Sequence, residues 1–562
     1  MTITIEKNKK YYMDRFRELK SEYQSDGTDA NDEEKTRYLR PHGRNLDEAK
    51  RPSDGERKDE YILNSTPLLA IRLAVAFFFS GMTPPTELWF RLADFDDEFN
   101  EMIEVAEFYH KATTRLFKDL DSSNFYAVIE QAFYDMLTYS RANVFVQEDF
   151  EDIFHFTHMP CGQYFIDVDG KGRVSNTYRE FTMRARDMLE EFGEENLSQE
   201  VKGSMKGGQT GGQQVNILHV IEKNTGRNVT KQDNQNMPWN SIYYEINGDD
   251  DNQKPLRKSG FRTKPNAVPR YNVSSGERYG NGPGDMALGD AKELQTYMKK
   301  LKLAIAKDLE PPILAPDDTI VNTGPNEVTE YNKTTGNTKP IEPLYRVSTD
   351  ISKLLALIID VQDRIKKVFF NDLFFSQAEA RDPKKTATQV RAEQRELLRL
   401  LGPITQRIIP ELLKPLILRC FDILLNMGRL PDIPEILQNR EIKVEIISSI
   451  TKAQELSVIA PIQDLLLSIS QMANAWPEVL DKFDAVQAID VIAKSLGIDP
   501  ELIRPDEVFE ELQKQKAQRL LQQEQTEAAG QAIEGAKTLS ETNMGTDNAL
   551  NAIINQRGGV AA

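Results

Sequence analysis

Apolar residues recur every three or four positions along residues 350–370, and this spacing predicts an amphipathic helix. A polar, charged loop follows at 371–385, before a second long helical pattern begins. Loops that join paired helices are usually shorter, because about two to eight residues are enough to reverse the chain. A charged loop of this length between two long helices therefore favours a functional role.

The second helix is predicted to begin at a capping box, in which Thr386 and Gln389 bond each other's backbone amides. Its interior contains Pro403, Pro410 and Pro415. Each proline removes one helical hydrogen bond, so we expect a bent or segmented helix.

A third helix is predicted at 286–310, after a glycine-rich loop at 276–284. At about 1.5 Å per residue this helix would be roughly 36 Å long. Between it and the helix at 350–370, residues 311–345 alternate short strand patterns with Gly, Asn and Pro turns. The order along the chain is therefore helix, small β element, helix, charged loop and segmented helix.

The rest of the chain mixes both periodicities, which predicts an α+β protein that is mainly helical. Residues 25–60 are polar and rich in turn formers, which indicates a loose loop, and Asp169-Gly170 favours a hairpin turn. The other expected helices are at 8–24, 66–81, 96–140, 182–192, 434–438, 452–475, 479–495 and 505–526, and the strands lie within 89–92, 142–181, 216–221, 242–246 and 261–262.

Composition narrows the classes of protein that fit this pattern. A chain of 562 residues is too long for one core, so several units are expected. Cys161 and Cys420 are too few for a disulfide scaffold, which favours a reduced cytosolic setting. The first residues lack an apolar signal core, and the longest apolar run, 67–79, is too short to cross a bilayer. The net charge of −18 argues against tight wrapping of DNA, although DNA could slide past such a surface.

The search for catalytic and metal chemistry yields weak signals. His155, His158 and Cys161 have H-x-x-H-x-x-C spacing, but in a strand the two histidines would point to opposite faces, so structural roles are favoured over a metal site. Gly282 and Gly284 fit a short phosphate-loop spacing without a preceding βαβ pattern. The sequence also lacks a P-loop. We therefore expect no catalytic residues, no metal, no cofactor and no enzyme.

A basic stripe is predicted on the segmented helix, where three arginines stand four residues apart. Two interpretations stay open for these residues. The stripe is either a solvated, salt-bridged helix face or a contact with another subunit or with nucleic acid. The residues are Arg391, Arg395 and Arg399.

Four stretches of sequence, together with the order of the elements, indicate a family resemblance. The most specific are GERYGNGPGDMALGDAKELQ at 276–295 and TATQVRAEQRE at 386–396, and they are supported by residues 70–92 and 160–181. Together they resemble the portal, or head-to-tail connector, proteins of short-tailed, T7-like bacteriophages. The resemblance covers most of residues 60–430, and beyond it only the helical composition is similar.

This resemblance implies a ring of about twelve copies around a central channel. It implies that the chain is divided into a wing of mixed structure, two stem helices, a clip, a tunnel loop that faces DNA, a long kinked wing helix, a helical crown and a flexible tail. The implied bounds are 1–285 for the wing, 286–310 and 346–370 for the stem helices, 311–345 for the clip, 371–387 for the tunnel loop, 388–428 for the kinked helix, 429–525 for the crown and 526–562 for the tail.

The resemblance also implies a portal function at one capsid vertex: initiation of capsid assembly, docking of the terminase motor for genome packaging, and later docking of the tail for DNA ejection. The implied partners are further copies of the chain, the terminase large subunit, tail adaptor and tail tube proteins, scaffolding and major capsid proteins, and double-stranded DNA bound without sequence specificity, with no membrane. The protein would reside in the virion, and in the host cytoplasm during assembly.

Site residues follow from the same resemblance. In the tunnel loop, Arg381, Lys384 and Lys385 would face DNA. A tail adaptor or another structural virion protein is the alternative, although neither needs this element order, and a nucleic-acid enzyme would need a P-loop or a metal-binding carboxylate cluster. The expected contacts in the stem and between subunits are Leu294, Leu301, Ile305, Leu355, Ile358 and Ile365.

Overall fold

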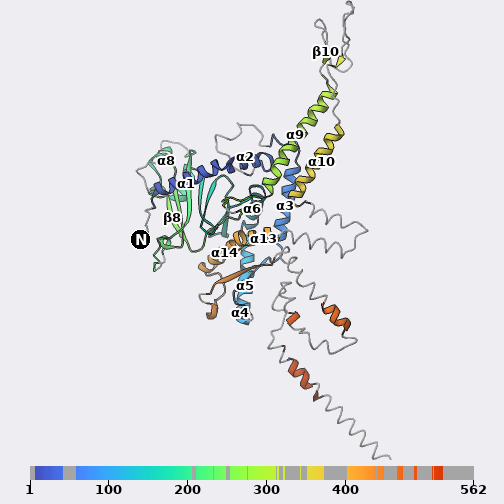
Figure 1. Cartoon of the computed structure of the whole chain (residues 1–562). Helices are drawn as coiled ribbons and strands as arrows, with labels where there is room; N and C mark the ends of the chain where they lie inside the picture. Colours follow the sequence, from blue (N-terminus) through green and yellow to red (C-terminus); the bar gives the residue numbers. More distant parts are fainter. Residues whose placement is uncertain are drawn as a thin grey trace, which may run out of the picture. The chain divides into compact units, whose positions relative to one another are not determined.

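The computed structural model of the chain divides into two compact units, Met1–Leu467 and Ser468–Ala562, and each is described by itself. Figure 1 shows the ribbon of the whole chain. The residues that the structure describes are 7–41, 43, 59–100, 102–205, 211–228, 230–231, 233–247, 254–274, 276–311, 313–314, 321–322, 342–343, 351–371, 402–437, 440–447, 465–472, 487–489, 509, 512–519 and 521–522.

The main core of the first unit is helical. Helix α3 (Thr66–Met82) follows Ser65 and has Pro67 in its first turn, where the missing amide hydrogen costs no helical bond. Its buried residues recur at helical spacing and pack against α6 (Phe125–Tyr139). Helices α4 (Asp97–Asn100) and α5 (Ile103–Ser122) complete this part of the chain.

A five-stranded antiparallel sheet with the order β4-β5-β6-β7-β8 forms the second layer. Buried side chains on one face meet α1 (Lys9–Ser25), and those on the other face meet α7 (Ala185–Phe192) and α8 (Gln199–Ser204). The hairpin predicted at Asp169-Gly170 joins the first two strands. The strands are β4 (Tyr164–Val168), β5 (Val174–Arg184), β6 (Gln214–Lys223), β7 (Trp239–Glu245) and β8 (Arg257–Phe261).

A smaller antiparallel sheet links this layer to the helical core. Its order is β3-β2-β9, with β2 (Val144–Asp149) paired to both β3 (Ile153–His158) and β9 (Asn266–Ala267). Val144 and Val146 of β2 belong to the helical core, whereas Phe145 belongs to the cluster under α1. The alternation along β2 thus connects the two cores.

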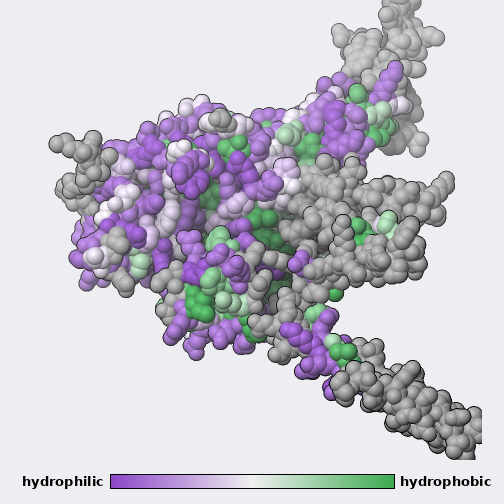
Figure 2. Space-filling model, turned by 60° about the horizontal axis from the view of Figure 1, so that its bottom comes forward, coloured by the Kyte–Doolittle hydropathy of each residue, from purple (hydrophilic) through white to green (hydrophobic). Residues whose placement is uncertain are grey.

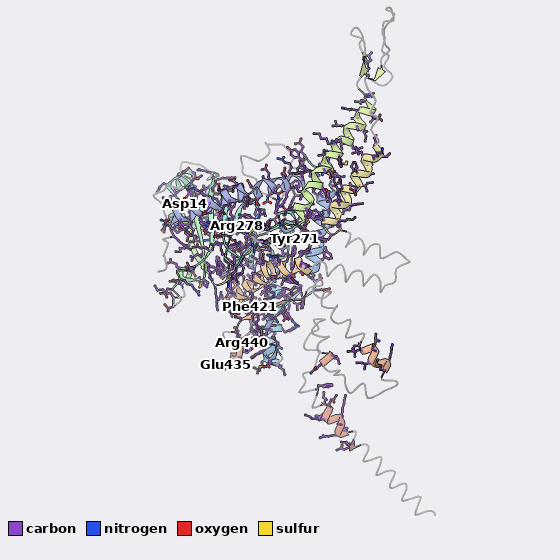
Figure 3. All side chains as sticks on the ribbon, viewed as in Figure 1. Asp14, Tyr271, Arg278, Phe421, Glu435 and Arg440 are labelled. Carbon is purple, nitrogen blue, oxygen red and sulfur yellow. The ribbon has the colours of Figure 1, made fainter. Side chains whose placement is uncertain are left out.

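Two strands far apart in sequence form a separate pair. β1 (Phe90–Asp94) pairs antiparallel with β12 (Ile442–Ile446). This strand lies within 429–525, a span that was expected to be helical, and at the predicted helix 434–438 the structure has a 3-10 turn, η5 (Glu435–Leu437). Next to the pair, Arg440, labelled in Figure 3, forms ion pairs with Asp94 at 3.3 Å and with Asp96 at 2.8 Å.

Two long helices, both predicted from the sequence, pair in antiparallel fashion. They are α9 (Pro283–Leu309) and α10 (Ile351–Val368), and both pack on the main core. Figure 1 shows them side by side, with β10 (Ile313–Leu314) beyond their far end, where it pairs with β11 (Glu342–Pro343). At about 1.5 Å per residue, the 27 residues of α9 extend roughly 40 Å.

The segmented helix is confirmed in its described part, residues 402–426. A helix α13 (Gly402–Ile408) runs into a π-helical turn, η4 (Ile409–Leu413), and then into α14 (Lys414–Asn426). The π turn contains Pro410, which has no amide hydrogen to give to the helix. The start predicted at Thr386 lies outside the described residues.

The loose loop predicted at 25–60 is wrong for its first part. Residues Thr28–Tyr38 form helix α2, which packs against α1 and α9. Its buried side chains include Asp32 and Lys35, so apolar periodicity could not reveal it. The predicted helix at 182–192 also begins later, because β5 continues to Arg184.

In the second unit, the described residues 468–472 and 512–519 are helical. They fall within the helices predicted at 452–475 and 505–526. The tail expected to be flexible, 526–562, lies outside the described residues.

Candidate assembly surface

Helix α9 begins at a carboxylate that closes its first turn. The Asp285 side chain accepts a hydrogen bond from the Gly282 amide at 2.9 Å and from the Ser140 hydroxyl at 2.6 Å. Burial raises the pKa of Asp285, but the Lys35 charge and these hydrogen bonds outweigh it, so the pKa lies below its usual value. The positive end of the helix dipole also stabilises a carboxylate at this position. The chain's own anion thus occupies the position at which the glycine spacing suggested a phosphate.

Glycines in the GNGPG motif allow backbones to meet at this point. A Cβ atom on Gly284 would lie 2.0 Å from the carbonyl oxygen of Thr138, in the last turn of α6. Gly280 has a positive φ of 78°, and its Cβ would lie 2.4 Å from the carbonyl oxygen of Asn272. Only glycine fits these two positions without movement of the neighbouring backbone. The motif therefore seats the base of α9 against α6.

Buried charges hold α2 against the same helix base. Lys35 forms ion pairs with Asp285 at 2.6 Å and with Asp32 at 3.5 Å. Asp32 also pairs with the buried Arg141 and accepts a hydrogen bond from the Tyr23 hydroxyl at 2.7 Å. Because buried charges are costly unless paired, each of these groups depends on the others. Asp32, Lys35, Arg141 and Asp285 are referred to below as the base cluster.

An apolar seam and one arginine fix α10 against α9. Leu294 and Leu301 of α9 are buried, as are Ile358, Val361 and Ile365 of α10, and all belong to the main core. Next to this seam, the Arg364 guanidinium of α10 binds Asp290 at 3.0 Å and Glu293 at 2.9 Å on α9. Burial of the apolar seam stabilises the contact between the two helices, and the ion pairs of Arg364 fix their register.

The flanks of α10 expose apolar side chains on both sides of that seam. Leu355 and Ile359, one turn apart, are 45% and 56% exposed, and Leu357 is 48% exposed. Leu357 lies about 200° from Leu355 around the helix, with the buried stripe between them. Figure 2 shows apolar surface among the polar residues of this helical pair. These three residues are called the α10 flanks below.

Neighbouring helices add to the exposed apolar surface. Leu69 and Leu73, one turn apart on α3, are exposed, and α3 packs against α10. Leu303 on α9 is exposed too. Single exposed leucines are ordinary, but several on adjacent helices are typical of a surface that another protein covers.

The six residues predicted as stem and subunit contacts divide into two groups. Leu294, Leu301, Ile358 and Ile365 are buried within the chain, where they hold its own helices together. Ile305 and Leu355 are exposed at 40% and 45% and remain available for such contacts. Sequence periodicity identified the apolar stripe but could not separate its buried centre from its flanks.

The predicted DNA-facing residues are not among those that the structure describes. Arg381, Lys384 and Lys385 of the predicted tunnel loop lie outside the described residues, and so do Arg391, Arg395 and Arg399 of the basic stripe. Most of the predicted clip, 311–345, lies outside them as well.

The possible metal residues His155, His158 and Cys161 have separate environments. His158 Nε2 lies 2.8 Å from an Asp135 carboxylate oxygen, whereas His155 is exposed. Cys161 is buried, and this burial raises the pKa of its thiol to about 12. Across the described part of the chain, no cluster of three or more His, Cys, Asp or Glu side chains could hold a metal ion.

Sequence reasoning missed the base cluster. Arg141 and Asp32 are more than a hundred residues apart, and nothing in their local sequence marks them as buried. The available signal was the acidic residues at 29–34 followed by Lys35 and Arg37, because acid–base spacing of three or four residues supports a helix. Within the described residues, no helix has the length and apolar character needed to cross a membrane.

Comparison with known proteins gives consistent matches over most of the chain. Residues 9–503 match the family described as "Bacteriophage head to tail connecting protein". The match extends beyond residue 430, where sequence reasoning found only similar composition. A "Probable portal protein" of Bordetella phage BPP-1 is 32% identical over 499 residues, covering 88% of this chain and 89% of that protein. A "Portal protein" of Salmonella phage epsilon15 is 33% identical over 508 residues, covering 90% of each.

Proposed function

The chain belongs to the family of bacteriophage head-to-tail connecting proteins, and from this premise we propose that it is a portal protein, which forms a ring-shaped DNA channel at one capsid vertex. The family resemblance inferred from the sequence is confirmed at this level. The observation that carries the proposal is the match over about nine-tenths of the chain to two phage proteins named as portals.

The α10 flanks support assembly into a ring. In a closed ring each subunit meets its two neighbours through two different surfaces. Leu355 and Ile359 lie on one side of the buried seam and Leu357 on the other, so one helix offers apolar contacts in both directions. Burying such side chains contributes about 1.5–3 kcal/mol each when burial is complete. We assign α9 and α10 to the stem, with a ring of about twelve subunits.

The remaining regions are assigned by analogy with the same family. Residues 1–285 and 388–428 would form the wing, 311–345 the clip, and 429–525 the crown, with β12 paired back to β1 of the wing. The clip lies between two antiparallel helices in sequence, so it belongs at one end of the stem. That end is the proposed docking site for the terminase large subunit during packaging and for tail proteins afterwards. Scaffolding and major capsid proteins would contact the ring during assembly.

The tunnel loop is proposed to face DNA without holding it. Between 371 and 387, three acidic residues offset the three basic residues Arg381, Lys384 and Lys385. A formally neutral loop suits a channel in which DNA must move, because each added phosphate contact strengthens salt-sensitive binding. Replacing Lys384 and Lys385 with Ala should leave rings intact and alter DNA retention across a salt series. Unchanged retention at every salt concentration would exclude both lysines from DNA contact.

Imaging of the purified full-length protein by electron microscopy tests the proposed function. The expected result is a ring with an axial hole and a subunit number near twelve. Monomers or open fibres at micromolar concentration would contradict it. A second arm tests the docking site: replacing 322–327 in the clip with a Gly-Ser linker should preserve rings and weaken capture of the terminase large subunit. Full capture would move the docking site elsewhere.

A further inference from the structure

A row of four polar side chains crosses the five-stranded sheet in register. Arg179 of β5 stands opposite His219 of β6, which stands opposite Tyr243 of β7, which stands opposite Arg257 of β8. The row lies on the face turned away from α1. Phe192 of α7 contacts Tyr243 there, with ring centroids 5.4 Å apart.

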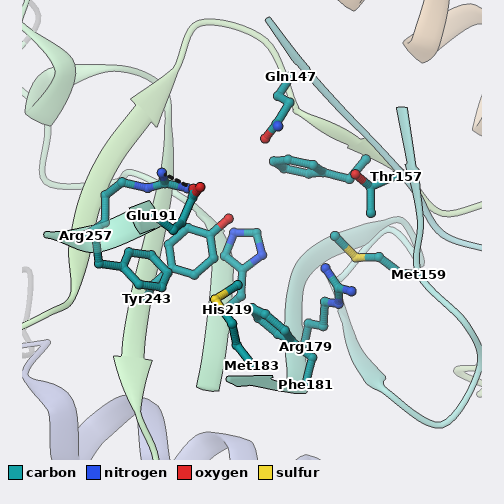
Figure 4. A pocket seen from close by; sticks show the side chains of 12 residues that line it. Gln147, Thr157, Met159, Arg179, Phe181, Met183, Glu191, His219, Tyr243 and Arg257 are labelled. Atoms are coloured by element: carbon teal, nitrogen blue, oxygen red, sulfur yellow. Dashed lines mark hydrogen bonds and ion pairs between the residues drawn. The ribbon is translucent and has the colours of Figure 1, made fainter. Parts of the chain in front are cut away.

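This row lines a cavity of about 130 Å³. Figure 4 shows His219 and Tyr243 at its centre, with Arg179 and Arg257 on opposite sides. Apolar side chains form much of the wall, including Phe145, Phe181, Met159 and Met183. This volume has room for several water-sized groups, and so for a small organic acid.

His219 lines this cavity, and one of its ring nitrogens has no hydrogen-bond partner among the described residues. Its ring stacks on Tyr243 at a centroid distance of 4.0 Å, and its Nε2 lies 2.9 Å from the Ser241 hydroxyl. The side chain is 1% exposed, and its Nδ1 has no hydrogen-bond partner among the described residues. Burial, with the Arg179 and Arg257 charges, holds the pKa of His219 well below its usual range, so the ring is neutral.

The two arginines differ in their partners. Arg257 forms an ion pair with Glu191 at 2.6 Å. Arg179 stacks over the Phe181 ring at 4.5 Å, and no carboxylate of the described residues pairs with it. Its Nε also lacks a partner there. Arg179 is half-buried, a position at which an arginine is usually paired, and it stays protonated. Two arginines and one glutamate leave a formal charge of +1 at this cavity.

We propose that this cavity binds a small organic carboxylate, with its carboxylate group on the Arg179 guanidinium and its alkyl part against Phe181, Met159 and Met183. The planar guanidinium matches a carboxylate in a paired geometry. A single negative charge balances the site. A phosphate dianion would exceed that balance and meet Glu191 at the rim.

Saturation-transfer NMR on the full-length protein, with sodium butyrate as the probe, tests this site, because it detects weak ligands on large assemblies. Saturation should pass to the butyrate methyl protons in the parent, and the signal should fall at least about tenfold in Arg179→Met. The matched control is Arg186→Met, an exposed arginine at the start of α7, which should leave the signal unchanged. Equal signals from Arg179→Met and the parent would overturn the proposal.

Further probes define the chemistry. The neutral isostere n-butanol should give little signal, and an equimolar phosphate addition should not displace butyrate. A butanol signal equal to that of butyrate, or displacement by phosphate, would overturn the carboxylate assignment. An N-acetyl-glutamate amide arm separates sources: its binding supports an acidic side chain of a partner protein, and binding of butyrate alone supports a free acid. If Arg179→Met fails to fold, Arg179→Lys keeps the charge and should still weaken butyrate several-fold; unchanged affinity would contradict the proposal.

Discussion

The base cluster buries charged side chains, whereas the α10 flanks expose apolar ones. At the base of α9, Asp32, Lys35 and Arg141 are buried charges, whereas Leu355 and Ile359 on the paired helix are apolar and exposed. Every charge of the base cluster has an opposite partner within the chain. The flanks have no such cover within the described residues. The first region is therefore complete within one chain, whereas the second is where we propose that another subunit packs.

The largest expected effect comes from breaking the base cluster. Asp32→Asn keeps the shape but leaves Arg141 and Lys35 without part of their counter-charge. Removing one member of a buried ion pair costs about 3–5 kcal/mol, so the free energy of unfolding should fall by that amount. Denaturant unfolding at fixed protein concentration measures it. Asp14→Asn, an exposed residue of α1, serves as the control and should change the unfolding free energy by less than about 0.5 kcal/mol.

Two glycines of α9 differ in how closely other atoms approach them, so their alanine variants form a matched pair. Gly284→Ala places a methyl group against the Thr138 carbonyl oxygen and should destabilise the protein by about 2–4 kcal/mol. Gly289→Ala, whose Cβ meets nothing within 4 Å, should stabilise it by about 0.5–1 kcal/mol through helix propensity. Thermal unfolding of both variants measures the contrast. Equal effects would mean that α9 does not approach α6 as described.

Lys264 is a partly buried cation that has no ion pair with a carboxylate among the described residues. Its Nζ donates to the Val174 carbonyl oxygen at 2.8 Å, and burial lowers its pKa to about 8. Between pH 8 and its usual value near 10.5, only the unfolded state binds this proton, so this group makes stability rise with pH. Relative to the parent, Lys264→Met should gain about 1–3 kcal/mol more at pH 7 than at pH 10.5.

Parallel urea titrations of the parent and Lys264→Met at the two pH values isolate the Lys264 proton, because the other titrating groups are common to both proteins. A parent-to-variant difference that does not change with pH would show that Lys264 titrates normally. Ion pairing would then contribute less to the stability of the buried cations in the base cluster than the comparison with Lys264 implies.

The smallest expected effect concerns Arg364, which lies between the two regions. It binds two acidic residues of α9 but is 44% exposed, so solvent screens these ion pairs. Arg364→Met should lower the free energy of unfolding only slightly, and less in high salt than in low salt. Unfolding in low and high salt measures this. A loss as large as that of Asp32→Asn would contradict the solvent-screened position of Arg364.

Sequence reasoning succeeded where burial is apolar and local. The periodicity of 286–310 and 350–370 predicted α9 and α10, and the Asp169-Gly170 turn predicted the β4–β5 hairpin. It failed for α2, because the buried face of that helix carries Asp32 and Lys35, which hydrophobic spacing reads as solvent-exposed.

The other features could not be predicted from the sequence, because they depend on contacts between residues far apart in the chain. Strand β12 is stabilised by β1, which lies about 350 residues earlier, and a short strand has no local signal of such a partner. The cavity on the five-stranded sheet was missed for the same reason, since Arg179, His219 and Arg257 become neighbours only through strand register. In the helical pair, the apolar stripe was predictable, but which of its residues stay exposed depends on the packed structure.

The most direct test of the account is the particle mass of the double variant Leu355→Asp/Ile359→Asp. Parent particles should have a ring mass near twelve times the 64.0 kDa chain. The double variant should be monomeric by mass photometry, because an interface cannot bury unpaired carboxylates. The monomer should still unfold cooperatively, because both substituted positions are exposed within the chain. Leu189→Asp, an exposed leucine of α7, is the control and should leave rings intact. Intact rings from the double variant would contradict assembly through the α10 flanks.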